Sequence, residues 1–205
     1  MTDPAAANAL AVQRLVLWLS AAFPTGAFAW SGGLEAAALE PEELRPWLET
    51  SLARGPLWND AVLCAAAHRG EDVDDLAFAL AGSRTRRDEL QSVGEGFRAA
   101  VRPWARVEAT SYPAAVGKAA RGIPAAAAIA AFLQSAVANQ VACAQRLMRL
   151  GQTVAMQLLR DLEPAVAAAA ARAAASTTDD LGGCALGMEM AAMRHETLST
   201  RIFRS

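Results

Sequence analysis

The chain has 205 residues, of which 54% are hydrophobic and 20% charged, a composition that excludes intrinsic disorder and suits one large core. Its net charge is −2 at pH 7 and Lys118 is its single lysine, so it lacks the basic patch that nucleic-acid binding requires. Alanine is abundant and aromatic residues make up only 6%, which favours an all-helical protein.

The first predicted element is a helix over residues 5–22, which ends at a loop containing proline and glycine. An alternative is a secretory signal peptide, because Arg14 precedes an apolar run and Ala27-Phe28-Ala29 resembles a cleavage site. Asp3 and the long leader before the run argue against export. Proline and glycine interrupt the uncharged stretch 15–34, so it does not suit a membrane span. We therefore expect a cytoplasmic protein with no membrane association.

The following elements are marked by helix start and stop signals. Pro41 at a first helical position and the acidic residues after it indicate a helix start, and Gly55-Pro56 indicates its end. Residues 104–121 give no clear signal. In chain order, we predict helices at 41–54, 57–68, 72–81, 85–101 and 124–150, one after Gly151, one from Pro164 to about Ser176, and a short one within 184–205.

The longest predicted helix, 124–150, has the pattern of a central core helix. Ile129, Leu133 and Val137 fall on one face, and the opposite face carries small or uncharged polar residues. Its alanine content and internal glutamines disfavour a membrane span. The sequence as a whole predicts an all-α, single-domain helical bundle over residues 1–205, with about eight to ten helices and a flexible C-terminal tail.

Residues for catalysis or metal binding are sparse in the sequence. The two histidines are His68 and His195, and Cys64 with His68 at i, i+4 supplies two ligands where a closed site needs more. Ser31 lacks the glycine that a nucleophile elbow carries two residues earlier. The three cysteines are widely spaced, which suits a reducing cytoplasm. We therefore predict no catalytic set, no bound metal and no cofactor.

Two segments remain unusual after this survey. Residues 23–35, the glycine-rich loop, combine three glycines with aromatic residues and carry no charge before Glu35. The C-terminal tail, residues 194–205, keeps Ile202 and Phe203 between arginines, where a chain terminus normally sheds apolar residues. Both segments suit a partner surface, and both equally suit packing against their own domain.

These two segments resemble the UreF family of urease accessory proteins. Leu19–Glu35 is similar to the family pattern P-x-G-x-F-x-Y-S-x-G-L-E, and 193–205 is similar to the ending M-R-H-E-T-Q-Y-S-R-L-F-R-S. Residues 146–157 are similar to R-L-x-P-L-G-Q-T-x-x-Q, and 85–92 and 179–182 give weaker matches. The chain departs from these patterns at Trp30 for tyrosine, Arg149 for proline, Val154-Ala155 for an acidic-glycine pair, and Leu198, Thr200 and Ile202 in the tail.

The resemblance implies a non-enzymatic, homodimeric cytoplasmic protein. The family bridges a second accessory protein, UreD (also called UreH), and the GTPase UreG, and it assists GTP-dependent nickel insertion into apo-urease. By resemblance we assign the tail to docking on UreD and the loop, more loosely, to the same partner face. The expected partner-binding residues are Arg194, His195, Glu196, Arg201, Phe203 and Arg204 in the tail, and Thr25, Gly26, Ser31, Gly32 and Glu35 in the loop.

An alternative hypothesis from another class is a helical enzyme or small-ligand binder. It would use the glycine-rich loop as a pocket mouth and Glu35 as a base. A buried Glu35 that faces an enclosed pocket, with His68 or His195 nearby, would favour this alternative, whereas an open surface loop would not.

Overall fold

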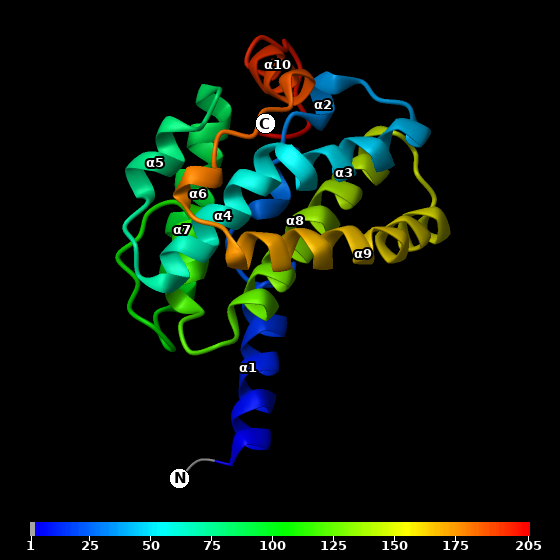
Figure 1. The fold of residues 1–205 in the computed structure, drawn as a ribbon. Helices are drawn as coiled ribbons and strands as arrows, with labels where there is room; N and C mark the ends of the chain where they lie inside the picture. The colour runs from blue at the N-terminus through cyan, green and yellow to red at the C-terminus, as the bar shows by residue number, and fades with distance from the viewer. Residues whose placement is uncertain (1–2) are drawn as a thin grey trace.

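The computed structural model describes residues 3–205, and every regular element within them is helical (Figure 1). This confirms the all-α prediction and its number of helices. The α-helices are α1 (Pro4–Trp18), α2 (Leu34–Ala37), α3 (Leu44–Arg54), α4 (Pro56–Arg69), α5 (Asp74–Ala79), α6 (Arg84–Val101), α7 (Tyr112–Ala119), α8 (Ala125–Leu147), α9 (Gln152–Ala175) and α10 (Leu186–His195). Short 3-10 helices are η1 (Ala27–Ala29), η2 (Pro41–Glu43) and η3 (Thr178–Asp180).

Helix boundaries differ most from the prediction in α1 and α9, and α2 and α7 lie where no helix was predicted. The first helix ends at Trp18 rather than at residue 22, and the Ser20 hydroxyl donates to the carbonyl of Leu17 just beyond its end. Pro164, predicted to begin a new helix, lies inside the continuous α9. Leu162 and Val166 on either side of it are buried in the core, and this packing holds the helix together where proline removes one backbone hydrogen bond.

Helix α8 packs against α9, α4 and α7, and α4, the most buried helix, packs against α3, α7, α8 and α9. Ile129, Phe132, Leu133 and Val137 are buried on α8. By length and hydropathy, α8 could also cross a membrane, and it is the one helix of residues 3–205 that meets that test. Its buried apolar side chains contact the other helices of the core, so part of its hydropathy serves packing within the fold.

Small residues let the helices approach closely. A Cβ at Gly117 of α7 would lie 2.3 Å from the carbonyl oxygen of Cys64 in α4, and one at Gly94 of α6 would lie 2.1 Å from that of Thr110. Both distances are far below contact, so these positions exclude any side chain. Together with the many alanines, they explain how a chain with few aromatic residues still forms a dense core.

Helix α1 projects from the body of the molecule (Figure 1). Leu15 and Trp18 are buried at its base, and the Trp18 ring packs edge-on against Trp104 with centroids 6.1 Å apart. The rest of the helix stands in solvent, although it is apolar on every side. Its exposed large apolar residues are Leu10, Val12, Val16 and Leu17.

Candidate partner surface and internal cavity

The glycine-rich loop owes its shape to three glycines with left-handed backbone conformations. Gly26, Gly32 and Gly33 have φ of 77°, 62° and 85°, a region that favours glycine. At Gly33 a Cβ would also lie 3.1 Å from the backbone nitrogen of Ala192, so glycine lets α10 lie against the start of α2. The loop therefore curls against the body of the molecule and brings Glu35 to face the tail.

Glu35 binds the tail directly. Its carboxylate accepts hydrogen bonds from the backbone N–H groups of Ile202 at 2.6 Å and Phe203 at 3.0 Å, and it pairs with Nε2 of His195 at 3.0 Å. Burial by itself would raise the pKa of Glu35. The two backbone N–H groups and the His195 ring outweigh burial and hold that pKa below its ordinary value of 4.5.

The last residues of the chain join the loop as well. The backbone N–H of Ser31 donates to the carbonyl oxygen of Ser205 at 2.7 Å, and the Ser31 hydroxyl donates to the same oxygen. Gly32 donates to the hydroxyl of Ser205 at 3.3 Å, and Arg204 donates to the carbonyl of Ala29 at 2.7 Å. The tail, expected to be flexible, is irregular in conformation and is held along its last residues by these bonds.

Two arginine–aromatic stacks strengthen the contact between loop, tail and α8. The Arg204 guanidinium lies 4.9 Å from the centre of the Trp30 ring, and that of Arg146 lies 4.7 Å from the ring of Phe203. Phe203 is only 4% exposed. Trp30, where the family pattern has tyrosine, thus offers a ring face to Arg204 in place of a hydroxyl group.

Glu196 connects the tail to α6. Its carboxylate accepts hydrogen bonds from the backbone N–H groups of Arg84 at 2.7 Å and Thr85 at 3.3 Å, which begin that helix. The hydroxyl of Thr85 in turn donates to the carbonyl of Ala192 at 3.3 Å. A carboxylate at a helix N-terminus satisfies free N–H groups and complements the helix dipole. Glu196 therefore anchors α10 to α6.

The structure brings the predicted loop and tail residues together but gives them different surroundings. Ser31, Gly32, Glu35, His195, Glu196 and Phe203 are engaged within the chain, as described above. Thr25 accepts a hydrogen bond from the backbone of Ala27, and Gly26 faces open space. Arg194, Arg201 and Arg204 are exposed, and within residues 3–205 none of these three forms an ion pair.

Apolar side chains accompany these arginines on the outer side of α10 and the tail. Leu186, Met190 and Met193 lie at i, i+4 and i+7 of α10 and are 66%, 41% and 47% exposed. Ile202 in the tail is also exposed. So is Phe28 in the loop, next to Ala29, whose carbonyl accepts a hydrogen bond from the backbone of Arg204. We call this surface the docking face; its residues are Phe28, Leu186, Met190, Met193, Arg194, Arg201, Ile202 and Arg204.

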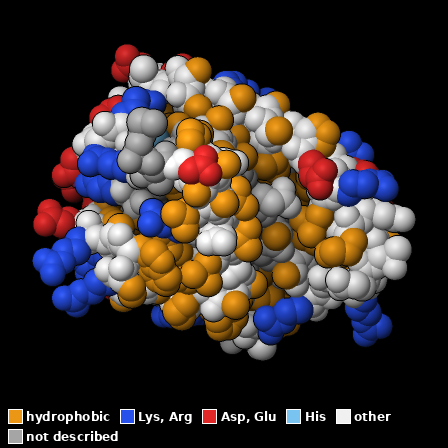
Figure 2. Space-filling view, turned by 90° about the horizontal axis from the view of Figure 1, so that it is seen from below, with side chains coloured by type: hydrophobic (Ala, Val, Ile, Leu, Met, Phe, Trp, Pro, Cys, Tyr) orange, Lys and Arg blue, Asp and Glu red, His pale blue; other side chains and the backbone are white. Residues whose placement is uncertain are grey.

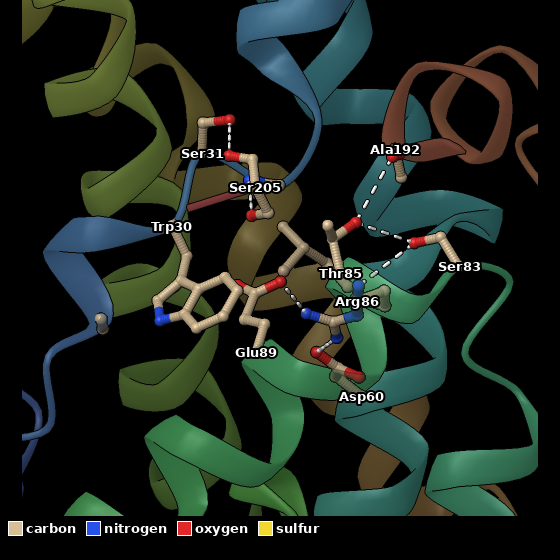
Figure 3. Close-up of polar contacts among 12 residues, drawn as sticks. Trp30, Ser31, Asp60, Ser83, Thr85, Arg86, Glu89, Ala192 and Ser205 are labelled. Carbon is tan, nitrogen blue, oxygen red and sulfur yellow. Dashed lines mark hydrogen bonds and ion pairs between the residues drawn. The ribbon is translucent and has the colours of Figure 1, made fainter. Parts of the chain in front are cut away.

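A cavity of ≈ 80 Å³, partly open to solvent, lies beside the loop between α3, α4, α6, α8 and α10. By volume it has room for on the order of five water molecules. Figure 3 shows Arg86 between Asp60 and Glu89 at this site, with Trp30 and Ser205 also in view. Arg86 donates to both carboxylates, to that of Glu89 at 2.9 Å. Sequence reasoning missed this cluster; its only signal was the weak family match at 85–92.

The charges of this cluster are largely removed from water. Side chains of Arg86, Asp60 and Glu89 are 18%, 10% and 17% exposed, so each carboxylate needs the guanidinium as a partner. Glu189 of α10 also lines the cavity but makes no such pair. Burial raises the pKa of Glu189 above its ordinary value of 4.5, Arg86 opposes that effect, and Asp60 adds to it.

The geometry disfavours Glu35 as a catalytic base. Glu35 is buried and His195 is adjacent, as the enzyme alternative requires, but neither residue lines the cavity. Both carboxylate oxygens already accept hydrogen bonds from the tail. His68 instead contacts the carbonyl of Ile123 at 2.9 Å. Across residues 3–205, no group of three or more histidine, cysteine, aspartate or glutamate residues is arranged to hold a metal ion.

The turn between α8 and α9 shows why one departure from the family pattern matters. Arg149 has a φ of 53°, whereas proline is restricted to a φ near about −65°. A proline could not adopt this conformation, so the role of that position cannot be carried over from the pattern. Gln145 and Gln152 bond across the turn at 2.9 Å.

Comparison with known sequences gives one consistent result. The sequence profile of the UreF family matches residues 38–163. The urease accessory protein UreF of Allorhizobium ampelinum is 41% identical over an alignment that covers 98% of this chain and 99% of the relative. Those of Rhizobium johnstonii and Mesorhizobium japonicum are each 43% identical, over 95% and 100% of this chain and 96% and 100% of the relative. These relatives are named for an accessory role to urease rather than for catalysis.

Proposed function

Since the chain belongs to the UreF family of urease accessory proteins, we propose that it is a non-catalytic scaffold in urease maturation. In this proposal it bridges UreD (UreH) and the GTPase UreG and assists GTP-dependent insertion of nickel into apo-urease. Nickel is then the cargo of the assembly, and the chain needs no resident metal or cofactor. The observation that carries the proposal is the docking face, an exposed surface held in place by the contacts of the loop and tail with each other.

The docking face has the chemistry of a protein interface. Arg194, Arg201 and Arg204 offer guanidinium groups that can bind carboxylates in a bidentate manner, and Met190 and Met193 offer adaptable apolar contacts. Arginine and methionine are both enriched in protein interfaces. We therefore assign UreD to this face, and we expect it to present carboxylates and apolar side chains there.

The loop and tail residues divide into two roles in this proposal. The three arginines contact the partner. Glu35, His195, Glu196 and Phe203, with Ser31 and Gly32, position the tail so that the arginines are presented on its outer side. Gly26 lies at the open edge of the loop, where a partner can approach, and Thr25 beside it packs against Gly96 of α6.

We further propose that α1 mediates a homodimer. The helix is apolar on every side and projects from the body, so it exposes surface that a second copy can bury. Figure 2 shows the molecule from the side toward which α1 projects, and hydrophobic side chains gather broadly across the lower half of that view. Arg14 is the one charged residue within α1, so the helix offers little charge for recognising an unlike partner. A symmetric contact between two copies is the simplest arrangement that covers it.

A charge introduced into the docking face tests the assignment of UreD. Met193→Glu places a carboxylate in the apolar stripe of α10, and Met156→Glu on α9 is its matched control, because both methionines are 47% exposed. We expect Met193→Glu to weaken co-purification with tagged UreD at least tenfold and Met156→Glu to leave it unchanged. Equal binding of both variants would refute the docking face.

The scaffold role itself is tested in cells that carry the urease genes and lack only this one. Restoring the wild-type chain should restore urease activity, and restoring Met193→Glu should do so only weakly. Full urease activity without the chain would refute the proposed function. The GTPase link is tested by asking whether UreG co-purifies with UreD only when the chain is present.

A further inference from the structure

The cavity beside the glycine-rich loop has an aromatic part to its lining. Four rings contribute, from the loop, α3, α7 and α8: Trp30, Trp47, Tyr112 and Phe132. Those of Tyr112 and Phe132 pack against each other with centroids 5.4 Å apart. An apolar wall with a few polar groups is typical of a site for a small organic molecule.

The charged part of the lining carries more negative than positive charge. Among residues 3–205, the charged residues that line the cavity are three acids, Asp60, Glu89 and Glu189, and one base, Arg86. Arg86 binds Asp60 and Glu89 (Figure 3), so two carboxylates already occupy its guanidinium. Glu189 has no ion pair in the described part of the chain. A cation entering the cavity would meet an unpaired carboxylate, whereas an anion would have to displace one from Arg86.

The surroundings of Glu189 leave its charge poorly compensated. Burial raises the pKa of Glu189, Arg86 opposes this effect and Asp60 adds to it, so the net shift is upward. The carboxylate also lies against the backbone of Gly82, where a Cβ would come within 2.2 Å of Oε2. Position 82 therefore has no room for a side chain that could pair with it. A positive charge inside the cavity would supply the missing compensation.

A second, smaller pocket of ≈ 20 Å³ adjoins the cavity at this carboxylate. Asn59, which is only 8% exposed, lines the smaller pocket, and its Nδ2 donates to the carbonyl of Gly183 at 2.9 Å. This bond fixes Oδ1 as the free acceptor of the amide, and Oδ1 has no hydrogen-bond partner within residues 3–205. A buried acceptor without a partner calls for a donor. The lining residues common to both pockets are Pro56, Asp60, Arg86, Leu90 and Glu189.

We propose that the cavity binds a small primary ammonium ion with an apolar body. The ammonium group lies between Glu189, Asp60 and Oδ1 of Asn59, and the body lies against the aromatic rings. A primary ammonium group supplies one positive charge and three N–H donors, which suit two carboxylates and an amide oxygen. Aromatic ring faces attract the same charge. A quaternary ammonium ion has no N–H donor and would leave Oδ1 of Asn59 unpaired.

The site differs from a metal site and from the docking face. No three histidine, cysteine, aspartate or glutamate residues of the described chain, 3–205, are arranged to hold a metal ion, so the excess of carboxylates does not serve a metal. Met188, Glu189 and Ala192 line the cavity from one side of α10, whereas Met190 and Met193 of the docking face are exposed on that helix. The proposal therefore goes beyond the proposed function and does not depend on it.

Binding can be measured on the isolated chain by NMR, from the indole N–H signals of its five tryptophans. Trp30 and Trp47 line the cavity, whereas Trp18, Trp58 and Trp104 do not. The probes are benzylamine, benzyl alcohol and benzoate, which share a phenyl body and differ in charge. We expect benzylamine to shift the Trp30 and Trp47 signals saturably and to bind at least tenfold more tightly than benzyl alcohol. Benzoate should not bind.

Two variants separate the charge of the site from its space. Glu189→Gln removes the unpaired charge and should weaken benzylamine binding at least tenfold. Its control is Glu163→Gln on α9, which is exposed outside the cavity and should leave binding unchanged. Ala136→Leu fills part of the cavity and should weaken benzylamine and benzyl alcohol alike. The tryptophan signals of each variant without ligand show whether it is folded.

Several results would overturn the proposal. Benzylamine could fail to bind saturably at millimolar concentration, or benzyl alcohol or benzoate could bind as tightly as benzylamine. Benzylamine could shift the signals of Trp18, Trp58 and Trp104 as much as the other two, which would place it outside the cavity. Unchanged binding to folded Glu189→Gln would remove the role of the carboxylate. Because no partner is present, the outcome is independent of whether UreD binds the docking face.

Discussion

The two ends of the chain contrast in regularity and in attachment. Helix α1 is regular for its full length and yet stands largely outside the body, whereas the C-terminal tail is irregular and yet bonded to the body along its last residues. A helix satisfies its own backbone groups, so it can stand in solvent once its base is packed. An irregular segment must find partners elsewhere for the N–H groups it buries. Regular structure is therefore a poor guide to which end the fold depends on.

The contrast also separates two kinds of apolar residue. Val16 of α1 is 68% exposed, and in the proposed homodimer a second copy would bury it. Phe203 of the tail is 4% exposed, and its burial is complete within one chain. Substitutions at the two ends should therefore affect different properties, association at α1 and stability at the tail.

The largest expected effect is on association through α1. Val12→Glu combined with Val16→Glu should weaken self-association at least a hundredfold, because two carboxylates would have to be buried without partners. Light scattering after size-exclusion chromatography measures it. Val154→Glu on α9 is the control, because Val154 and Val12 are both 52% exposed. A wild-type chain that is monomeric at every concentration would contradict the role of α1.

The next effect concerns stability and the ring of Phe203. Phe203→Ala should lower the free energy of unfolding by about 3 kcal/mol, as truncation of a buried aromatic side chain does. Ile202→Ala, one residue earlier and 56% exposed, should change it by less than about 0.5 kcal/mol. Urea unfolding of both variants gives the comparison. Similar values for the two would mean that the tail is not anchored through Phe203.

A smaller effect follows from the charge of Glu35. Glu35→Gln should lower the free energy of unfolding by about 2 kcal/mol, because an amide replaces a buried carboxylate that accepts charge-assisted bonds. Glu43→Gln is the matched control, since Glu43 also accepts a backbone N–H, that of Glu40 at 2.9 Å, but in an exposed position. Equal losses in the two variants would show that burial adds nothing to the Glu35 bonds.

The smallest effect is a difference in pH dependence between Glu35 and Glu189. The lowered pKa of Glu35 means that its stabilisation is complete above pH 4.5 and is lost as the pH falls through the lower folded value. The raised pKa of Glu189 has the opposite sign: its favourable contribution exists below 4.5 and is lost as the pH rises through the higher folded value. Unfolding measured from acid to neutral pH should therefore give opposite slopes for the differences between wild type and the two glutamine variants. Slopes of the same sign would contradict this assignment.

Sequence reasoning succeeded where structure depends on local signals. The Pro41 start, the stripe on 124–150 and the glycine ends placed most helices near their observed bounds. It failed at Pro164. Proline favours a helix start over a helix interior, but the packing of Leu162 and Val166 keeps α9 continuous there.

The candidate site was predictable only in part. The sequence marked the loop and tail as unusual, but it left open whether they form a partner surface or pack against their own domain. Their packing depends on contacts between residues more than a hundred positions apart, such as Glu35 with Phe203. The Arg86 cluster was missed for the same reason, since Asp60 comes from another helix. A charged residue on a helix has the same sequence signal whether it faces solvent or an oppositely charged side chain of another helix.

The bond between Ser31 and Ser205 joins residues 174 positions apart, and this separation bears on the order of folding. Closing so long a loop costs chain entropy that only later contacts repay, so such pairings form late. During synthesis, residues 202–205 emerge long after the glycine-rich loop, which must wait for them. We therefore expect the helical core to form first and the contact between the two segments to complete the molecule as its final folding step.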